Sequence, residues 1–174
     1  MAVLRGMGGV AAVLLRVGDK HVARAELSPR CADLEKRVAI LLRMAQIKIH
    51  GIRDCLRPRR EQVSDAIHAS VVEALQYPPE KRAHRFFYFA RDDFLYPPAP
   101  GRSDDYTIIE ISMFEGRSVD AKKLLVALLF ERLHREAGLA PVNVEITITE
   151  TPRHNWGLRG VTGDELALDY VVEV

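Results

Sequence analysis

One stretch of the chain, residues 107–149, limits the fold more than any other because it reads as strand, helix and strand in direct succession. Ile109 and Ile111 alternate with polar residues, which predicts a half-buried strand. Leucines then recur at spacings of three and four, as on one face of a helix: Leu124, Leu125, Leu128, Leu129 and Leu133. A period of two returns over residues 142–149. The stretch therefore predicts a βαβ unit with parallel strands and a right-handed connection.

The turn between the first strand and the helix carries an arginine. Gly116 breaks the strand, Ser118 is a favourable N-cap, and Asp120 falls in the first helical turn. Arg117 lies between them, where helix N–H groups favour an anion and a guanidinium matches a carboxylate or phosphate. We therefore expect Arg117 to bind the carboxylate of a small ligand, or otherwise to cap a surface carboxylate.

The same order of elements occurs earlier in the chain, from Met44 onward. Ile47 and Ile49 match Ile109 and Ile111 at a constant offset of 62 (109 − 47 and 111 − 49). An amphipathic helix follows and is stopped by a proline pair, and the aromatic run 84–89 predicts the second strand. The chain thus contains an internal duplication of a βαβ unit.

Composition places the chain among ordinary globular proteins. Its 174 residues suit one core, and a net charge of +1 gives no reason to expect nucleic acid or a membrane surface as a partner. No apolar run approaches the roughly 18 residues of a membrane span. Cys31 and Cys55 lack metal-ligand spacing, as do the histidines, so we expect free thiols, a cytoplasmic location and no metal.

The first 43 residues do not fit this pattern. Their apolar segment is short and interrupted by Arg16, and no clear signal-peptide cleavage site follows it. Two interpretations are open: residues 1–43 are a loosely attached extension, or the true start is Met44.

At the other end, the alternation of Leu168, Tyr170 and Val172 predicts a short strand that pairs with a neighbouring subunit.

Several motifs of residues 44–174 resemble the tautomerase superfamily. The run 114–118, Phe-Glu-Gly-Arg-Ser, with Lys122 and Lys123 downstream, is similar to the strand-to-helix turn of 4-oxalocrotonate tautomerase. The segments 148–150, 155–157 and 163–167 are similar to the carboxyl-terminal part of the same family. With both halves present, the chain resembles the fused branch that includes malonate semialdehyde decarboxylase.

The resemblance implies an α+β fold of duplicated units, β-α-β-β-α-β, in which the sheet packs against two helices. It also implies a homotrimer and cofactor-free keto–enol isomerase or lyase chemistry on a small 2-oxo or enol carboxylate. Arg117 falls at the carboxylate-binding arginine of the family, and Trp156 falls at its apolar pocket wall.

The chain departs from the family pattern where the general base belongs. The family uses an amino-terminal proline, whereas this chain has Ala45 at that place, inside the chain as written. Removal of everything before Ala45 would free a primary amine, which could act as a base or form an imine. Lys81 replaces a carboxylate of the decarboxylase branch, and Glu145 replaces a second arginine.

Two further residues are candidates for the site. Arg82 and His84 belong to a basic cluster at a strand start; Arg82 could bind substrate, and His84 could serve as acid or base at neutral pH. Their ordinary interpretation is a solvated strand edge. Two functions remain open: a tautomerase-like enzyme, or a homologue without the proline that forms a trimer and binds a small carboxylate without catalysis.

Overall fold

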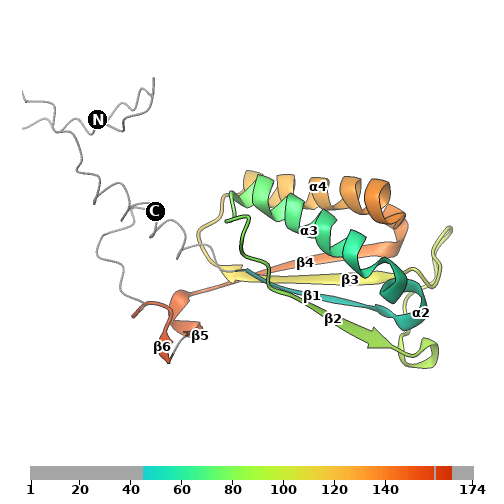
Figure 1. Ribbon diagram of the computed structural model, residues 1–174, viewed down its shortest axis with the longest axis horizontal. Helices are drawn as coiled ribbons and strands as arrows, with labels where there is room; N and C mark the ends of the chain where they lie inside the picture. Colours follow the sequence, from blue (N-terminus) through green and yellow to red (C-terminus); the bar gives the residue numbers. More distant parts are fainter. Residues whose placement is uncertain (1–44, 159, 166–174) are drawn as a thin grey trace, which may run out of the picture. The chain divides into compact units, whose positions relative to one another are not determined.

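The computed structural model describes residues 45–158 and 160–165, which build a four-stranded sheet covered on one face by two long helices (Figure 1). The elements of the two units are β1 (Ala45–Ile52), α3 (Arg60–Leu75), β2 (His84–Phe89), β3 (Thr107–Phe114), α4 (Val119–Ala137) and β4 (Val144–Thr151). The strand order is β2-β1-β3-β4. Strands β1 and β2 are parallel, as are β3 and β4, while β1 and β3 are antiparallel. The predicted α+β fold of two βαβ units is confirmed.

Short elements connect and extend the two units. They are α2 (Arg53–Leu56), the 3-10 helices η1 (Arg57–Arg59), η2 (Arg91–Asp93), η3 (Pro141–Asn143) and η4 (Arg153–Asn155), and the hairpin strands β5 (Gly157–Leu158) and β6 (Val161–Thr162). The predicted extension 1–43 and the predicted terminal strand at 166–174 lie outside the described residues. Within the described part of the chain, no helix is long and apolar enough to cross a membrane.

The duplication extends to the ends of the elements. Strand β3 begins and ends 62 residues after β1 (107 − 45 and 114 − 52), and α4 ends 62 residues after α3 (137 − 75). In the antiparallel pairing, Ile47 faces Ile111 and Ile49 faces Ile109. Each of these isoleucines therefore faces the equivalent of the other, and only Lys48 pairs with its own equivalent, Glu110 (48 + 62 = 110). An approximate two-fold axis passes through that pair.

The core lies between the sheet and the two helices. The isoleucines of β1 and β3 that face the helices are at most 2 % exposed: Ile47, Ile49, Ile109 and Ile111. The buried stripe of α4 is narrower than predicted. Leu125, Leu129 and Leu133 are fully buried, whereas Leu124 is 46 % exposed. The fully buried leucines form an i, i+4, i+8 row along α4, which also packs along α3.

The other face of the sheet is not covered by any described helix (Figure 1). His50 stacks on Phe87 with ring centroids 4.8 Å apart, and Phe87 is 40 % exposed. Oε2 of Glu110 lies 3.3 Å from Nε2 of His50 and 3.5 Å from Nζ of Lys48. The aromatic run of β2 thus divides between the two faces, because Phe86 and Tyr88 pack against the main core.

Candidate active site

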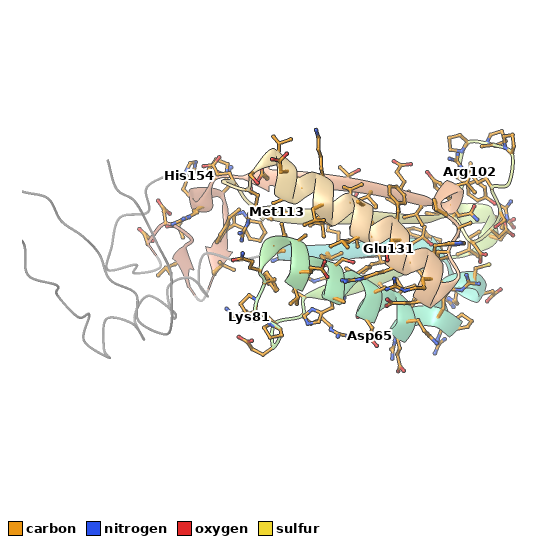
Figure 2. All side chains as sticks on the ribbon, turned by 90° about the horizontal axis from the view of Figure 1, so that it is seen from above. Asp65, Lys81, Arg102, Met113, Glu131 and His154 are labelled. Atoms are coloured by element: carbon orange, nitrogen blue, oxygen red, sulfur yellow. The ribbon has the colours of Figure 1, made fainter. Side chains whose placement is uncertain are left out.

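The start of β1 and the end of β3 meet at one end of the sheet because the two strands are antiparallel. Ala45 pairs with Met113 there and is 4 % exposed. Met113 marks this end in Figure 2, and Arg102 marks the opposite end. We call the first end the Arg117 pole, defined by Ala45, Tyr77, Arg117, Glu150 and Trp156. The second end is the Tyr106 pole, defined by Phe94, Tyr96, Tyr106 and Glu145.

The turn that carries Arg117 has the predicted geometry. Gly116 has a φ of 110°, a conformation that other residues adopt only with strain. The hydroxyl of Ser118 accepts a hydrogen bond of 3.1 Å from the N–H of Ala121, so its predicted role as N-cap is confirmed. These two residues fix the backbone on either side of Arg117.

The backbone N–H of Arg117 donates to Oε1 of Glu150 over 3.1 Å. The other carboxylate oxygen accepts from Lys122 Nζ at 2.7 Å. The expectation that this N–H would be left for a ligand anion was wrong, because Glu150 already occupies it. A ligand carboxylate at this pole would therefore bind to the guanidinium of Arg117.

Glu150 is a site residue that the sequence motifs did not predict. The signal was present, since Glu150 lies near the carboxyl end of the strand parallel to β3. The register places it beside Met113, next to the turn. A carboxylate at that position is well placed to orient the arginine turn.

The side chain of Arg117 extends from the start of α4 toward the end of α3. Its Nη1 lies 3.5 Å from the carbonyl oxygen of Leu75. Two residues further on, the hydroxyl of Tyr77 lies 3.4 Å from the backbone nitrogen of Ala45. Burial raises the pKa of Tyr77, and the positive charge of Arg117 opposes that shift. The guanidinium, the tyrosine hydroxyl and the nitrogen of Ala45 are thus brought together from three separate elements.

Trp156 is fixed beside the end of β3. Its ring packs edge-to-face on Phe114 with centroids 5.0 Å apart, and its Nε1–H donates to Thr151 Oγ1 over 2.7 Å. The N–H of Gly163 donates to the Trp156 carbonyl at 2.7 Å, and a Cβ at position 163 would lie 2.6 Å from the Arg153 carbonyl oxygen. A glycine is therefore required at position 163, where the hairpin packs against this loop. The indole contacts Phe114, which precedes Arg117 by three residues, and so adds apolar surface beside the arginine turn.

Arg82 and His84 make their contacts with the exposed edge of α3. Arg82 donates to Asp65 at 2.6 Å and to Ser64 Oγ at 3.2 Å, while His84 Nδ1 lies 2.9 Å from Ser64 Oγ. Burial, aided by the charge of Arg82, lowers the pKa of His84 to about 4. His84 is therefore neutral at pH 7 and has no ring proton to supply as an imidazolium acid.

A hollow of about 380 Å³ adjoins this cluster. Its lining residues come from α3 and from the start of β2: Arg60, Glu61, Ser64, Asp65, Arg82 and Phe86. Arg60 pairs with Glu61 and Arg82 pairs with Asp65, so the two cations there are already balanced by carboxylates. Within residues 45–158 and 160–165, no three His, Cys, Asp or Glu side chains are grouped to hold a metal ion.

The Tyr106 pole, which the two-fold axis relates to the Arg117 pole, is filled by side chains. The offset of 62 places Cys55 where the other pole has Arg117 and Thr107 where it has Ala45. Tyr106 is 3 % exposed, packs on Tyr96 with centroids 5.0 Å apart, and donates to Glu145. The duplication has therefore given one pole with Arg117 at the strand-to-helix turn and another in which Cys55 takes that position and an aromatic cluster fills the end of the sheet.

Comparison with known proteins decides the family. The family model described as "Tautomerase enzyme" matches residues 81–159. The 2-hydroxymuconate tautomerase of Comamonas testosteroni is 37 % identical over 57 residues, which are 33 % of this chain and 90 % of that protein. The chain belongs to the tautomerase superfamily. The match 81–159 includes Arg82, His84, Arg117 and Trp156, and it does not reach Ala45.

Solved structures resemble this tautomerase-superfamily chain over both halves. A malonate semialdehyde decarboxylase inhibited by 3-bromopropiolate has a TM-score of 0.63 and 26 % identity, covering 74 % of this chain and 99 % of that one. A fused 4-OT protein solved as an asymmetric trimer has a TM-score of 0.61 and 18 % identity, covering 70 % of this chain and 98 % of that one. These similarities extend the family fold to the full duplicated unit.

Proposed function

We propose that this tautomerase-superfamily protein binds a small 2-oxo or enol carboxylate at the Arg117 pole and interconverts its keto and enol forms, or performs related lyase chemistry, without a cofactor. The observation that carries the proposal is the convergence of Arg117, Trp156 and the nitrogen of Ala45 at one end of the sheet. The names of the similar proteins, a 2-hydroxymuconate tautomerase and a malonate semialdehyde decarboxylase, both refer to small carboxylates.

Arg117 is the carboxylate clamp of this proposal. Glu150 holds its backbone, and Lys122 holds Glu150, so the guanidinium starts from a fixed turn. Trp156 and Phe114 supply the apolar wall that excludes water from the bound ligand. Arg82 is a second candidate contact, although its charge is already paired with Asp65.

The group that moves the proton is, in this proposal, the amine of Ala45. The amine exists only in a protein that begins at Ala45, which would require residues 1–44 to be absent. A free α-amine has a pKa of about 7.7–8.0 and is a competent base near neutral pH. The rest of the domain, residues 45–174, is proposed to fold without the preceding extension because both βαβ units lie within it.

A binding protein without catalysis is the second candidate. Its support is the residue at position 45, since an alanine in peptide linkage has an amide nitrogen with no basic lone pair. The carboxylate clamp does not depend on that nitrogen. The two functions therefore share one site and differ in the presence of a base.

We propose that the protein is a homotrimer. Strands β2 and β4 are both unpaired edges within the described sheet, and the open face carries the exposed Phe87. A similar fused protein forms a trimer. Light scattering of the full chain should give about three times its 19.6 kDa. A stable monomer at micromolar concentration would contradict the proposal.

Replacing the clamp should weaken ligand binding. We expect Arg117→Ala to raise the Kd for pyruvate at least tenfold, because one lost charge-assisted hydrogen bond costs roughly 1.5–3 kcal/mol. Arg117→Lys should restore binding only in part, since an ammonium lacks the planar fork. Isothermal titration calorimetry on the full-length variants measures both.

Two other arginines serve as comparisons for this measurement. Arg135 is on the exposed side of α4 and pairs with Glu131, so Arg135→Ala should leave the Kd unchanged. Arg82→Ala tests the second candidate contact. An effect of Arg82→Ala equal to that of Arg117→Ala would place the ligand at the edge of α3 instead of the Arg117 pole.

The amine proposal predicts that catalysis depends on the first residue. Protein that begins at Ala45 should retain a cooperative thermal transition and should ketonise phenylenolpyruvate, followed by ultraviolet absorbance. One added residue before Ala45 should abolish turnover and leave pyruvate binding intact, because the nitrogen is then an amide. Equal turnover by the full chain would exclude the amine and point to a side chain such as His84. Binding without turnover in either form would support the binding protein.

A further inference from the structure

Tyr77 is a buried polar residue of the Arg117 pole that has no part in the function proposed above. It follows the last residues of α3, at the point where Gln76 turns the chain with a φ of 50°. Only 6 % of Tyr77 is exposed. Its hydroxyl lies within 3.4 Å of the nitrogen at which the proposed chemistry takes place.

The backbone around Tyr77 is stiff. Pro78 follows it directly, which restricts Tyr77 to extended conformations, and Pro79 extends the restriction. The N–H of Lys81 donates to the Pro78 carbonyl at 3.0 Å and closes the turn. The hydroxyl is therefore held in one place before any ligand arrives, which lowers the entropic cost of using it.

The Tyr77 hydroxyl can still donate its own hydrogen to a ligand. The Ala45 N–H donates to the Tyr77 oxygen, so the oxygen acts as an acceptor there. Within residues 45–158 and 160–165, the Tyr77 hydroxyl has no acceptor for its own hydrogen. Because desolvation raises the pKa of the phenol, the hydroxyl remains protonated at neutral pH. It is a neutral donor and not a base.

A 2-oxo acid has a second polar group next to its carboxylate. Arg117 reaches toward the end of α3, with Nη1 3.5 Å from the Leu75 carbonyl, and its charge acts on the Tyr77 hydroxyl. A carboxylate on that guanidinium would bring the adjacent carbonyl carbon, and its oxygen, toward the Tyr77 hydroxyl. A carboxylic acid without a 2-oxygen would bind to the arginine alone.

We propose that the Tyr77 hydroxyl donates a hydrogen bond to the 2-oxygen of the substrate and so selects 2-oxo and enol carboxylates over simple carboxylates. The inference rests on the proposed function, since it requires Arg117 to bind the carboxylate. During keto–enol conversion, negative charge develops on this oxygen, and a fixed donor stabilises it without giving up its proton. Tyr77 is thus both a specificity-determining residue and a contact of the reacting oxygen.

Two ligands that differ only at the 2-position test the assignment. Pyruvate carries the oxygen and propionate lacks it, and ligand-observed NMR titrations of the full chain give the Kd of each. Tyr77→Phe keeps the ring and removes one neutral hydrogen bond, so it should weaken pyruvate about three- to tenfold and propionate less than about twofold. The matched control is Tyr88→Phe, because the buried Tyr88 hydroxyl has no partner within the described residues. It should change neither Kd.

The pH dependence adds a second readout. The charged side chain that acts on Tyr77 is Arg117, which keeps its charge throughout. The raised pKa of Tyr77 means that loss of its proton begins only above the ordinary range of a tyrosine. The ratio of pyruvate affinities of wild type and Tyr77→Phe should therefore stay constant from pH 6 to 9. A ratio that falls toward one within that range would show a tyrosinate and overturn the neutral donor.

The outcomes separate this inference from the function on which it rests. If Arg117→Ala weakens both ligands but Tyr77→Phe weakens neither, or weakens both equally, the clamp stands and the role of Tyr77 is wrong. If wild type binds neither ligand, or Arg117→Ala has no effect on either, the proposed function fails and the assignment of Tyr77 fails with it. The inference is supported if Tyr77→Phe weakens pyruvate binding more than propionate binding and Tyr88→Phe weakens neither.

Discussion

The antiparallel pairing of β1 with β3 is the contact on which the rest of the structure depends. It joins the two βαβ halves into one sheet and buries Ile47 against Ile111 and Ile49 against Ile109. Each isoleucine contributes roughly 1.5–3 kcal/mol when it is buried fully. The pairing also brings the start of one half beside the strand-to-helix turn of the other, where we propose that the ligand binds.

The same pairing creates two poles related by the two-fold axis, and different side chains occupy them. The Arg117 pole holds a guanidinium, a tyrosine hydroxyl and a tryptophan around the start of β1. At the Tyr106 pole, an aromatic cluster with Phe94 occupies the equivalent space, and Cys55 replaces the arginine. Duplicated units thus need not give duplicated sites. In the proposed site, the first half contributes Ala45 and Tyr77 and the second half contributes Arg117.

Much of the fold could be predicted because local patterns agree with it. The offset of 62 is visible in two pairs of isoleucines, Ser118 has the chemistry of an N-cap, and Gly116 has the conformation that its turn requires. The width of the buried face of α4 could not be predicted, since it depends on how α4 packs against α3. Leucine spacing alone does not distinguish a core position from the exposed Leu124.

The candidate site was only partly accessible from sequence, for a physical reason. Arg117 and Trp156 belong to recognisable motifs, and the structure places both at the Arg117 pole. Glu150 accepts a hydrogen bond from the backbone N–H of Arg117, which the sequence had suggested was open to a ligand. The parallel register of β3 and β4 brings these two residues together although 33 positions separate them in the chain. Tyr77 lies in a proline-rich connection whose sequence suggests only a helix end. Its place beside Ala45 results from the sheet and from α3 together.

The central claim is that each chain has one ligand site, built at the Arg117 pole by both halves. A crystal structure of the full chain with pyruvate tests it most directly. We expect one pyruvate per chain, with its carboxylate on the Arg117 guanidinium and its 2-oxygen facing Tyr77. Pyruvate bound instead at the Tyr106 pole, or in the hollow beside Arg82, would contradict it.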